Sequence, residues 1–257
     1  MSMTRLNIRE EVAARSRITD DDTGEKTILN NFINRAMEEI QVFSNWWFLE
    51  HEFVLNTSQA PVLTAGTRTY AFPALDINGN TADMAEINRH SMHTKSEAIP
   101  YFWPDQQDRA QPGWMDPSNT GATGSPRYWT TVREQIIFDK TPSSDFIAIN
   151  DTIYFRGSVN IEPMSEDTDV PSQIPEQWHW VIAEGALWRA LHYQDPMGST
   201  WERQKQHFSA RGRRYVQGKS ILEQMVEQSN PIRTTPLRIG APVVFGITGR
   251  RSSNVRS

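Results

Sequence analysis

The spacing of hydrophobic residues predicts two helices at the N-terminal end of the chain. Between Glu25 and Phe43, apolar residues recur at intervals of three and four, which is typical of a helix with one buried face. A shorter helix is expected over Leu6–Arg15, with Ile8 and Val12 as its inner face. Both helices therefore need a partner surface that covers their apolar stripes.

Helical patterns return after an acidic linker, Glu162–Pro175. Residues Glu176–Gln194 are apolar on nearly every side, so this helix is expected at the centre of a bundle. A second helix is expected from Trp201 to about Gln228, and Ser199 and Glu202 have the spacing of a capping box at its start. Its apolar seam repeats every seven residues, at Trp201, Phe208, Tyr215 and Leu222.

In the middle of the chain, the spacing of hydrophobic residues changes from the helical period of 3.6 to the strand period of 2. Short alternating runs between turn residues indicate an antiparallel sheet or a small sandwich. The expected strands lie around Phe53–Leu55, Thr69–Phe72, Tyr128–Val132, Gln135–Phe138, Phe146–Ile149 and Ile153–Val159. A loop rich in proline and glycine is expected over Trp103–Ser125.

The order of these elements predicts an α+β fold. We expect an antiparallel helix bundle formed by the N- and C-terminal helices, an inserted antiparallel β domain and an extended C-terminal arm. The expected boundaries are 1–49 for the first helices, 50–161 for the β domain, 162–229 for the later helices and 230–257 for the arm.

Composition narrows the classes of function. The chain has 257 residues, of which 37% are hydrophobic and 22% charged, so it has the material for a packed core. The formal net charge of −5 argues against a dedicated binder of duplex DNA or of anionic membranes. No cysteine is present, which excludes disulfides and thiolate metal sites. No apolar run is long enough to cross a bilayer, so no membrane partner is expected.

The last 28 residues, Asn230–Ser257, differ from the rest. They hold five arginines but no acidic residue and no lysine, and the rest of the chain is left with 21 basic against 31 acidic residues. Three prolines exclude a continuous helix here. A frayed terminus is one interpretation. The apolar residues favour another, an arm that becomes ordered when it lies in a groove on a partner with an acidic rim. DNA binding through the arm is a weaker third.

Candidate chemistry is sparse. His90 and His93 have the spacing of two metal ligands but lack a suitable carboxylate, so no metal is expected. Glu184 is a candidate general acid if it is buried, with an ion pair to Arg189 or a position on the helix surface as the commoner outcome. His179 is expected to be structural. No phosphate loop or nucleophile motif is present in the sequence, so we expect neither an enzyme nor a cofactor.

The nine tryptophans allow a different function, the stacking of sugar rings on exposed indoles. Several of them fall at helical positions that face the core. Trp103, Trp114 and Trp129 lie where a surface site is expected. A carbohydrate-binding or fibre-attachment module is therefore the alternative hypothesis.

Several motifs, taken in order, resemble the head-to-tail adaptor (connector) proteins of tailed bacteriophages. No single motif is diagnostic, but the ordered set covers most of residues 25–190. The motifs are Ile28–Ala36, Trp46-Trp47, Thr64–Pro73, Gly124–Trp129, Ile136–Phe138, Ile153–Phe155, and Ile174–Trp178 leading into Glu184-Gly185-Ala186.

This resemblance implies a non-enzymatic virion protein that forms a dodecameric ring beneath the portal and passes DNA without binding it specifically. Its implied partners are the portal ring, copies of itself and a tail or nozzle protein, with a tail fibre as a further candidate. The implied location is the head–tail junction of the virion, and the host cytoplasm during assembly. The residues expected to dock on the portal or on a neighbouring subunit are Arg233, Leu237, Arg238, Ile239, Val243, Val244 and Phe245.

Overall fold

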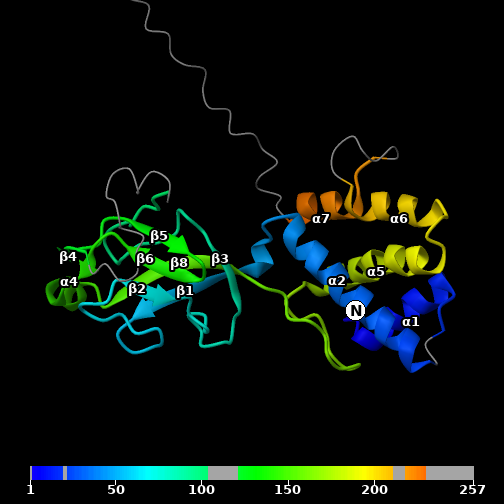
Figure 1. Ribbon diagram of the computed structural model, residues 1–257, viewed down its shortest axis with the longest axis horizontal. Coiled ribbons are helices and arrows are strands. Elements are labelled where there is room, and N and C mark those ends of the chain that lie inside the picture. Colours follow the sequence, from blue (N-terminus) through cyan, green and yellow to red (C-terminus); the bar gives the residue numbers. More distant parts are fainter. Residues whose placement is uncertain (1, 20–21, 104–120, 211–217, 230–257) are drawn as a thin grey trace, which may run out of the picture.

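Helices and strands occupy opposite ends of an elongated molecule (Figure 1). The computed structural model describes residues 2–19, 22–103, 121–210 and 218–229. The α-helices within these ranges are α1 (Arg5–Ser16), α2 (Thr23–Phe43), α4 (Ser144–Ile149), α5 (His179–Gln194), α6 (Thr200–Ser209) and α7 (Ile221–Ser229). All of them except α4 gather at one end (Figure 1). The mixture of helix and sheet confirms the α+β class.

Three small sheets make up the other end. The first has the strand order β1-β8-β3 and is antiparallel, the second has the order β2-β6-β5 and is also antiparallel, and the third pairs β4 with β7 in parallel. The strands are β1 (Glu50–Asn56), β2 (Thr69–Ala71), β3 (Met84–Ile87), β4 (Thr123–Gly124), β5 (Trp129–Val132), β6 (Gln135–Phe138), β7 (Thr141–Pro142) and β8 (Thr152–Val159). Most were predicted, but β3 and the parallel pair were not.

The two N-terminal helices form where their hydrophobic spacing predicts them, and local capping fixes their starts. Thr4 and Asn7 make a capping box at α1, with each side chain bonded to the backbone N–H of the other. The Asp22 carboxylate accepts a hydrogen bond from the backbone of Gly24 and so caps α2. The buried positions of α2 step by three and four along one face, which confirms the predicted stripe.

Helix α5 lies at the centre of the helical end, as its nearly continuous apolar surface predicts. It packs against α1, α2 and α6. Gly185 makes this packing close, because a Cβ atom there would lie 2.6 Å from the ring of Phe208 on α6 and 2.8 Å from the Cβ of Ala36 on α2. A 3-10 turn, η2 (Glu176–Trp178), leads into α5.

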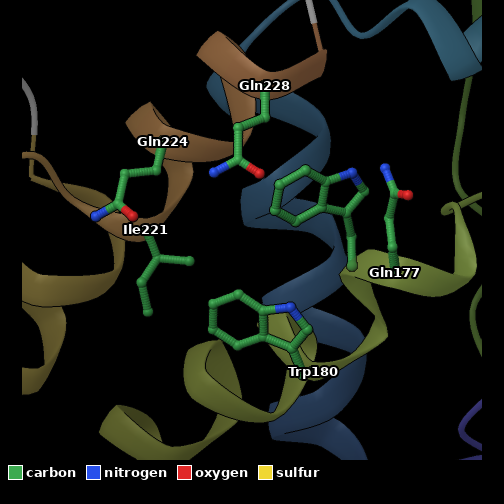
Figure 2. A pocket seen from close by; sticks show the side chains of 6 residues that line it. Gln177, Trp180, Ile221, Gln224 and Gln228 are labelled. Carbon is green, nitrogen blue, oxygen red and sulfur yellow. The ribbon is translucent and has the colours of Figure 1, made fainter. Parts of the chain in front are cut away.

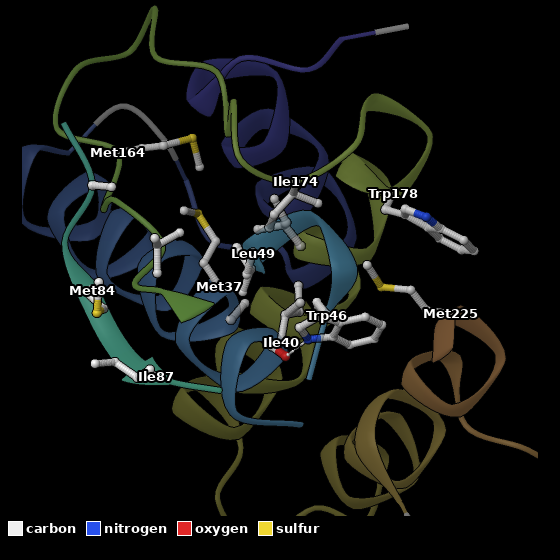
Figure 3. Close-up of a cluster of buried hydrophobic side chains, with 14 of the residues drawn as sticks. Met37, Ile40, Trp46, Leu49, Met84, Ile87, Met164, Ile174, Trp178 and Met225 are labelled. Carbon is white, nitrogen blue, oxygen red and sulfur yellow. Dashed lines mark hydrogen bonds between the residues drawn. The ribbon is translucent and has the colours of Figure 1, made fainter. Parts of the chain in front are cut away.

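One buried cluster joins the two ends of the molecule (Figure 3). Met37 and Ile40 of α2 lie near Leu49 of the 3-10 turn η1 (Trp47–Leu49), with Met84 and Ile87 on the strand side (Figure 3). The cluster also includes Trp46, Trp178 and Met225. Trp46 is 2% exposed, and its indole N–H donates to the carbonyl of Ile40 at 2.5 Å. The end of α2 is thereby fixed at the point where β1 begins.

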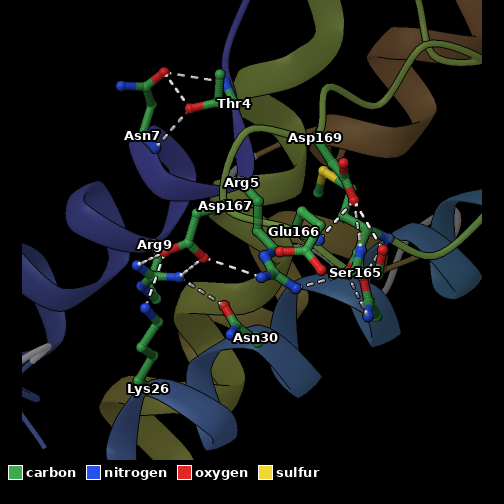
Figure 4. Close-up of polar contacts among 12 residues, drawn as sticks. Thr4, Arg5, Asn7, Arg9, Lys26, Asn30, Ser165, Glu166, Asp167 and Asp169 are labelled. Carbon is green, nitrogen blue, oxygen red and sulfur yellow. Dashed lines mark hydrogen bonds and ion pairs between the residues drawn. The ribbon is translucent and has the colours of Figure 1, made fainter. Parts of the chain in front are cut away.

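Residues 160–175 connect β8 to the 3-10 turn before α5, and we call them the return segment. One carboxylate in this segment holds it on the N-terminal helices (Figure 4). Asp167 accepts two hydrogen bonds from Arg9, at 2.6 and 3.0 Å, one from Arg5 at 3.0 Å and one from Lys26 at 2.9 Å. These cations, with Arg9 contributing most, hold the pKa of the Asp167 carboxyl well below its usual range. We call this group the Asp167 cluster: Arg5, Arg9, Lys26 and Asp167.

Backbone groups reinforce the same contact. The first two N–H groups of α1, those of Arg5 and Leu6, donate to the carbonyls of Asp169 at 2.8 Å and Asp167 at 3.1 Å. The first N–H groups of a helix have no partner within the helix, so the return segment supplies acceptors that α1 needs. The expected acidic linker is therefore part of the packed structure.

The strand expected at Phe146–Ile149 is wrong, because these residues belong to helix α4. The Ser143 hydroxyl accepts from the backbone N–H of Phe146 and caps the helix. Phe146 is buried whereas Ala148 and Ile149 are exposed, so the short apolar run does not have the alternating burial of a strand. A run of four apolar residues does not separate these two alternatives by periodicity.

The continuous helix expected from Trp201 to about Gln228 is also wrong. Helix α6 ends at Ser209, where Ala210 takes extended backbone angles, and α7 begins at Ile221. Ser199 stands at the N-cap position of α6, but its side chain makes no capping bond there. A reciprocal capping box is found instead at the start of α7, between Ser220 and Glu223.

Replacing Gly185 by alanine is expected to destabilise the protein by about 1–3 kcal/mol, because the added methyl group overpacks the contact between α2, α5 and α6. Urea denaturation followed by circular dichroism measures the change. Gly24→Ala is the matched control, since its Cβ would meet Asp22 at an ordinary 3.6 Å. Equal stability of the two variants would contradict the close packing described for Gly185.

Asp167→Asn is expected to lower the free energy of unfolding by about 3 kcal/mol, because it removes the charge of a carboxylate that accepts two hydrogen bonds from the 2%-exposed side chain of Arg9. The depressed pKa means that the wild-type contribution is complete above about pH 4 and is lost as the pH falls below that value. Asp151→Asn, which breaks the exposed pair with Lys95, is the control and is expected to change little. Parallel stability–pH curves for wild type and Asp167→Asn would overturn this assignment.

Candidate docking site

The seven residues expected to dock on a partner, from Arg233 to Phe245, lie outside the described residues. The description of the chain ends at Ser229, the last residue of α7. The surface around α7 is therefore the part of the described structure that lies next to residue 230 in the chain.

Helix α7 is anchored by one face. Ile221, Leu222 and Met225 are buried, and the last two are fully so. The Ser220 hydroxyl accepts from the backbone of Glu223, while the Glu223 carboxylate accepts from the backbone of Ser220 at 3.1 Å. The helix packs on α6 and reaches the core through Met225 (Figure 3). Its start and its inner face are thus both fixed.

A pocket of about 350 Å³ lies between α7 and the start of α5 (Figure 2). We call it the indole–amide pocket. Its lining residues are Gln177, Trp178, Trp180, Ile221, Gln224 and Gln228. On α7 they recur at intervals of three and four, so they share one face of the helix. The sequence does not predict this site, because the residues of α7 were expected to be part of a longer helix.

The pocket combines aromatic faces with neutral amides. Trp178 is 6% exposed and forms part of the core, whereas Trp180 is 43% exposed and presents its ring to the opening. Gln224 donates one hydrogen bond to the carbonyl of Lys219 at 2.9 Å. Within the described ranges, the side chains of Gln177 and Gln228 have no hydrogen-bond partner. Each free amide can donate and accept, which is the capacity needed to pair with a peptide backbone.

Among the described residues that flank the pocket lining, acidic side chains outnumber basic ones. Glu176 precedes Gln177 on η2, and Glu223 and Glu227 lie on α7. Lys219 pairs with Glu227 and so compensates one of these carboxylates. The rim is therefore suited to a cationic partner.

Two of the three tryptophans proposed for a sugar site, Trp103 and Trp129, pack on the ring of Tyr101, with centroids 5.6 and 4.9 Å from it, but they differ in exposure. Trp129 is fully buried, so its expected surface position is wrong. Trp114 lies outside the described residues. Trp103 is 47% exposed, and the guanidinium of Arg89 lies 4.3 Å from the centre of its ring. Of the two described candidates, only Trp103 is therefore exposed, and a cation lies over its ring.

The candidates for catalysis and metal binding have structural surroundings. Among the described residues, no group of three or more His, Asp or Glu side chains is arranged to hold a metal ion. His179 is 2% exposed and bonds to the backbone of Met3 and Ile174, so it is structural as expected. The expected pair of Glu184 with Arg189 is wrong. Glu184 instead binds Arg15 at 2.5 Å and Gln204 at 2.5 Å, and Arg189 binds Glu39 at 2.6 Å.

Comparison with known families identifies the chain. The family described as SU10 adaptor protein matches residues 3–239. The chain belongs to this family. The match covers both the helical and the strand ends and extends into the C-terminal segment, and it confirms the resemblance to tailed-phage head-to-tail adaptors. A search of curated proteins found no match.

Membership in the SU10 adaptor family gives the general role. The protein is a structural adaptor of a phage, and this role implies a place in the virion and contacts with portal and tail components. The family implies a non-enzymatic protein, which agrees with the structural contacts of His179 and Glu184. In the described part of the chain, no helix combines the length and apolarity needed to cross a membrane.

Proposed function

We propose that the protein forms a ring at the junction of portal and tail, joins the two, and lets DNA pass during packaging and ejection. The observation that carries this proposal is the family match over residues 3–239. In the proposed assembly, twelve copies contact one another and the portal ring on one side, and a tail or nozzle protein on the other. Assembly would begin in the host cytoplasm and end in the virion.

The charge of the chain supports a passage for DNA. Residues 1–229 carry 21 basic and 31 acidic side chains. The phosphates of DNA therefore bind this acidic body only weakly. A basic lining would hold the duplex and slow its movement. In this proposal the helices of residues 1–49 and 162–229 form a bundle that makes the ring, and residues 50–161 form an inserted β domain.

The C-terminal arm, residues 230–257, supplies attachment in this proposal. Its arginines and apolar residues suit a neighbour with an apolar groove and an acidic rim. The proposed contact residues on the portal or on a neighbouring subunit are Arg233, Leu237, Arg238, Ile239, Val243, Val244 and Phe245.

Deleting residues 230–257 is expected to leave the body folded but to abolish attachment to the portal. Electron microscopy of the full chain mixed with its portal should show rings on the portal, whereas the truncated chain should show bare portals. Circular dichroism controls for folding of the truncated body. Equal attachment by the truncated chain would refute the role of the arm, and the absence of any complex with the full chain would refute the adaptor ring itself.

A carbohydrate-binding or fibre-attachment module is the second candidate, favoured by the exposed indole of Trp103 beside Arg89. It predicts that the protein binds a glycan array and that Trp103→Ala abolishes binding. Trp47→Ala, which removes another exposed indole, is the control. We expect no glycan binding, and binding that depends on Trp103 would favour this second function over the ring.

A further inference from the structure

The indole–amide pocket lies beside the last described residues of the chain. Gln228 lines the pocket, and the description ends one residue later, at Ser229. We propose that the indole–amide pocket of each copy receives the C-terminal segment of a neighbouring copy, through residues 230–239. This inference rests on the proposed ring, and it names the surface by which one subunit holds the next.

The chemistry of the pocket fits a proline-containing peptide. The segment reads Asn-Pro-Ile-Arg-Thr-Thr-Pro-Leu-Arg-Ile, with prolines at 231 and 236. Proline rings pack on indole faces, and extended proline-containing segments dock in grooves lined by aromatic residues. Trp180 offers such a face, and Ile221 lines the pocket with it (Figure 2). The amides of Gln177 and Gln228 can each donate to and accept from a peptide backbone.

Charge complementarity favours this segment over the rest of the chain. Residues 230–239 carry Arg233 and Arg238 and no acidic side chain. In the described part of the chain, the flanks of the pocket carry the carboxylates of Glu176, Glu223 and Glu227 and the ammonium group of Lys219, which pairs with Glu227. Opposite charges at the rim of an apolar contact fix its register and raise the rate of association. The 31 acidic residues of the body make other segments of the chain poorer partners for this rim.

Direction and reach favour a neighbouring copy. Ile221, Gln224 and Gln228 line the pocket along α7, so the segment of the same chain would have to reverse at Ser229 and run back along the helix it has just left. The segment of another copy needs no such reversal. The C-terminal segment is also long compared with the helices of one copy. If extended, its 28 residues span up to about 90 Å, whereas α5 is roughly 24 Å long. In such a contact, each copy gives its segment to one neighbour and receives a segment from the other. This is a head-to-tail contact, and head-to-tail contacts form rings when the rotation between copies closes.

Disulfide cross-linking of the full chain tests the inference, because the sequence contains no cysteine. The variant Gln224→Cys/Thr234→Cys places one thiol at the pocket and one in the segment. Mild oxidation followed by non-reducing electrophoresis is expected to give dimers and a ladder of higher species. Val42→Cys/Thr234→Cys is the matched control, since Val42 is 76% exposed and does not line the pocket. Each single-cysteine variant measures random dimerisation.

Three results would overturn the proposal. One is a cross-link within single chains, which means that the pocket holds its own segment. Another is a yield no higher than that of the Val42 control. The third is an unchanged yield in Trp180→Ala, which is expected to lower cross-linking about tenfold or more if the indole anchors the segment. Trp47→Ala is the control for loss of an exposed indole.

The two proposals fail separately. Rings that form on the portal without cross-links through the pocket would refute this inference and leave the adaptor ring standing. Cross-linked chains that never form a ring or bind the portal would refute the proposed function, although the pocket would then still be a contact between copies.

Discussion

The helical end depends on the interaction of one carboxylate with three cations. Asp167 joins the return segment to α1 through Arg5 and Arg9 and to α2 through Lys26. Arg9 is almost fully buried, and a buried charge is tolerated only with a compensating partner and hydrogen bonds. The α1 backbone needs the same segment for its first N–H groups. The chain that returns from the strands is therefore held on the N-terminal helices before α5 begins, and this sets where α5 enters.

From this entry point, the packing of the remaining helices follows in steps. Gly185 lets α5 approach both α2 and α6 more closely than any other residue would. Helix α6 then positions α7, whose Met225 reaches the same core as Trp46 and Trp178. Because Trp178 is held in that core and Trp180 lies two residues further along, the second indole faces outward beside α7. The indole–amide pocket is thus a consequence of core packing and not of a local motif.

The sequence predicts elements whose signal is local and repeated over several turns. The starts and ends of α1 and α2 lie within two residues of the predictions, because each has buried residues at helical spacing and a side chain that caps its start. Helix α4 was missed because the apolar run at Phe146 is too short to show a period, and the Ser143 cap decides it. The Asp167 cluster joins residues more than 140 positions apart, and no pattern in the sequence pairs them. Trp129 was misplaced for the same reason, since partners distant in sequence bury it.

The distribution of charge has a consequence for how copies would associate. An acidic body repels other copies at long range, whereas the cationic segment is attracted to any of them. The pocket itself has a neutral lining of indoles, amides and one aliphatic side chain, so attraction at its rim brings a segment near while apolar contact holds it. Salt weakens the electrostatic attraction at the rim but not the apolar contact inside the pocket. In the proposed ring, the segment that overcomes the repulsion between bodies is also the segment whose prolines fit the pocket. The pocket therefore recognises this segment by its charge and its shape together, and not by either one alone.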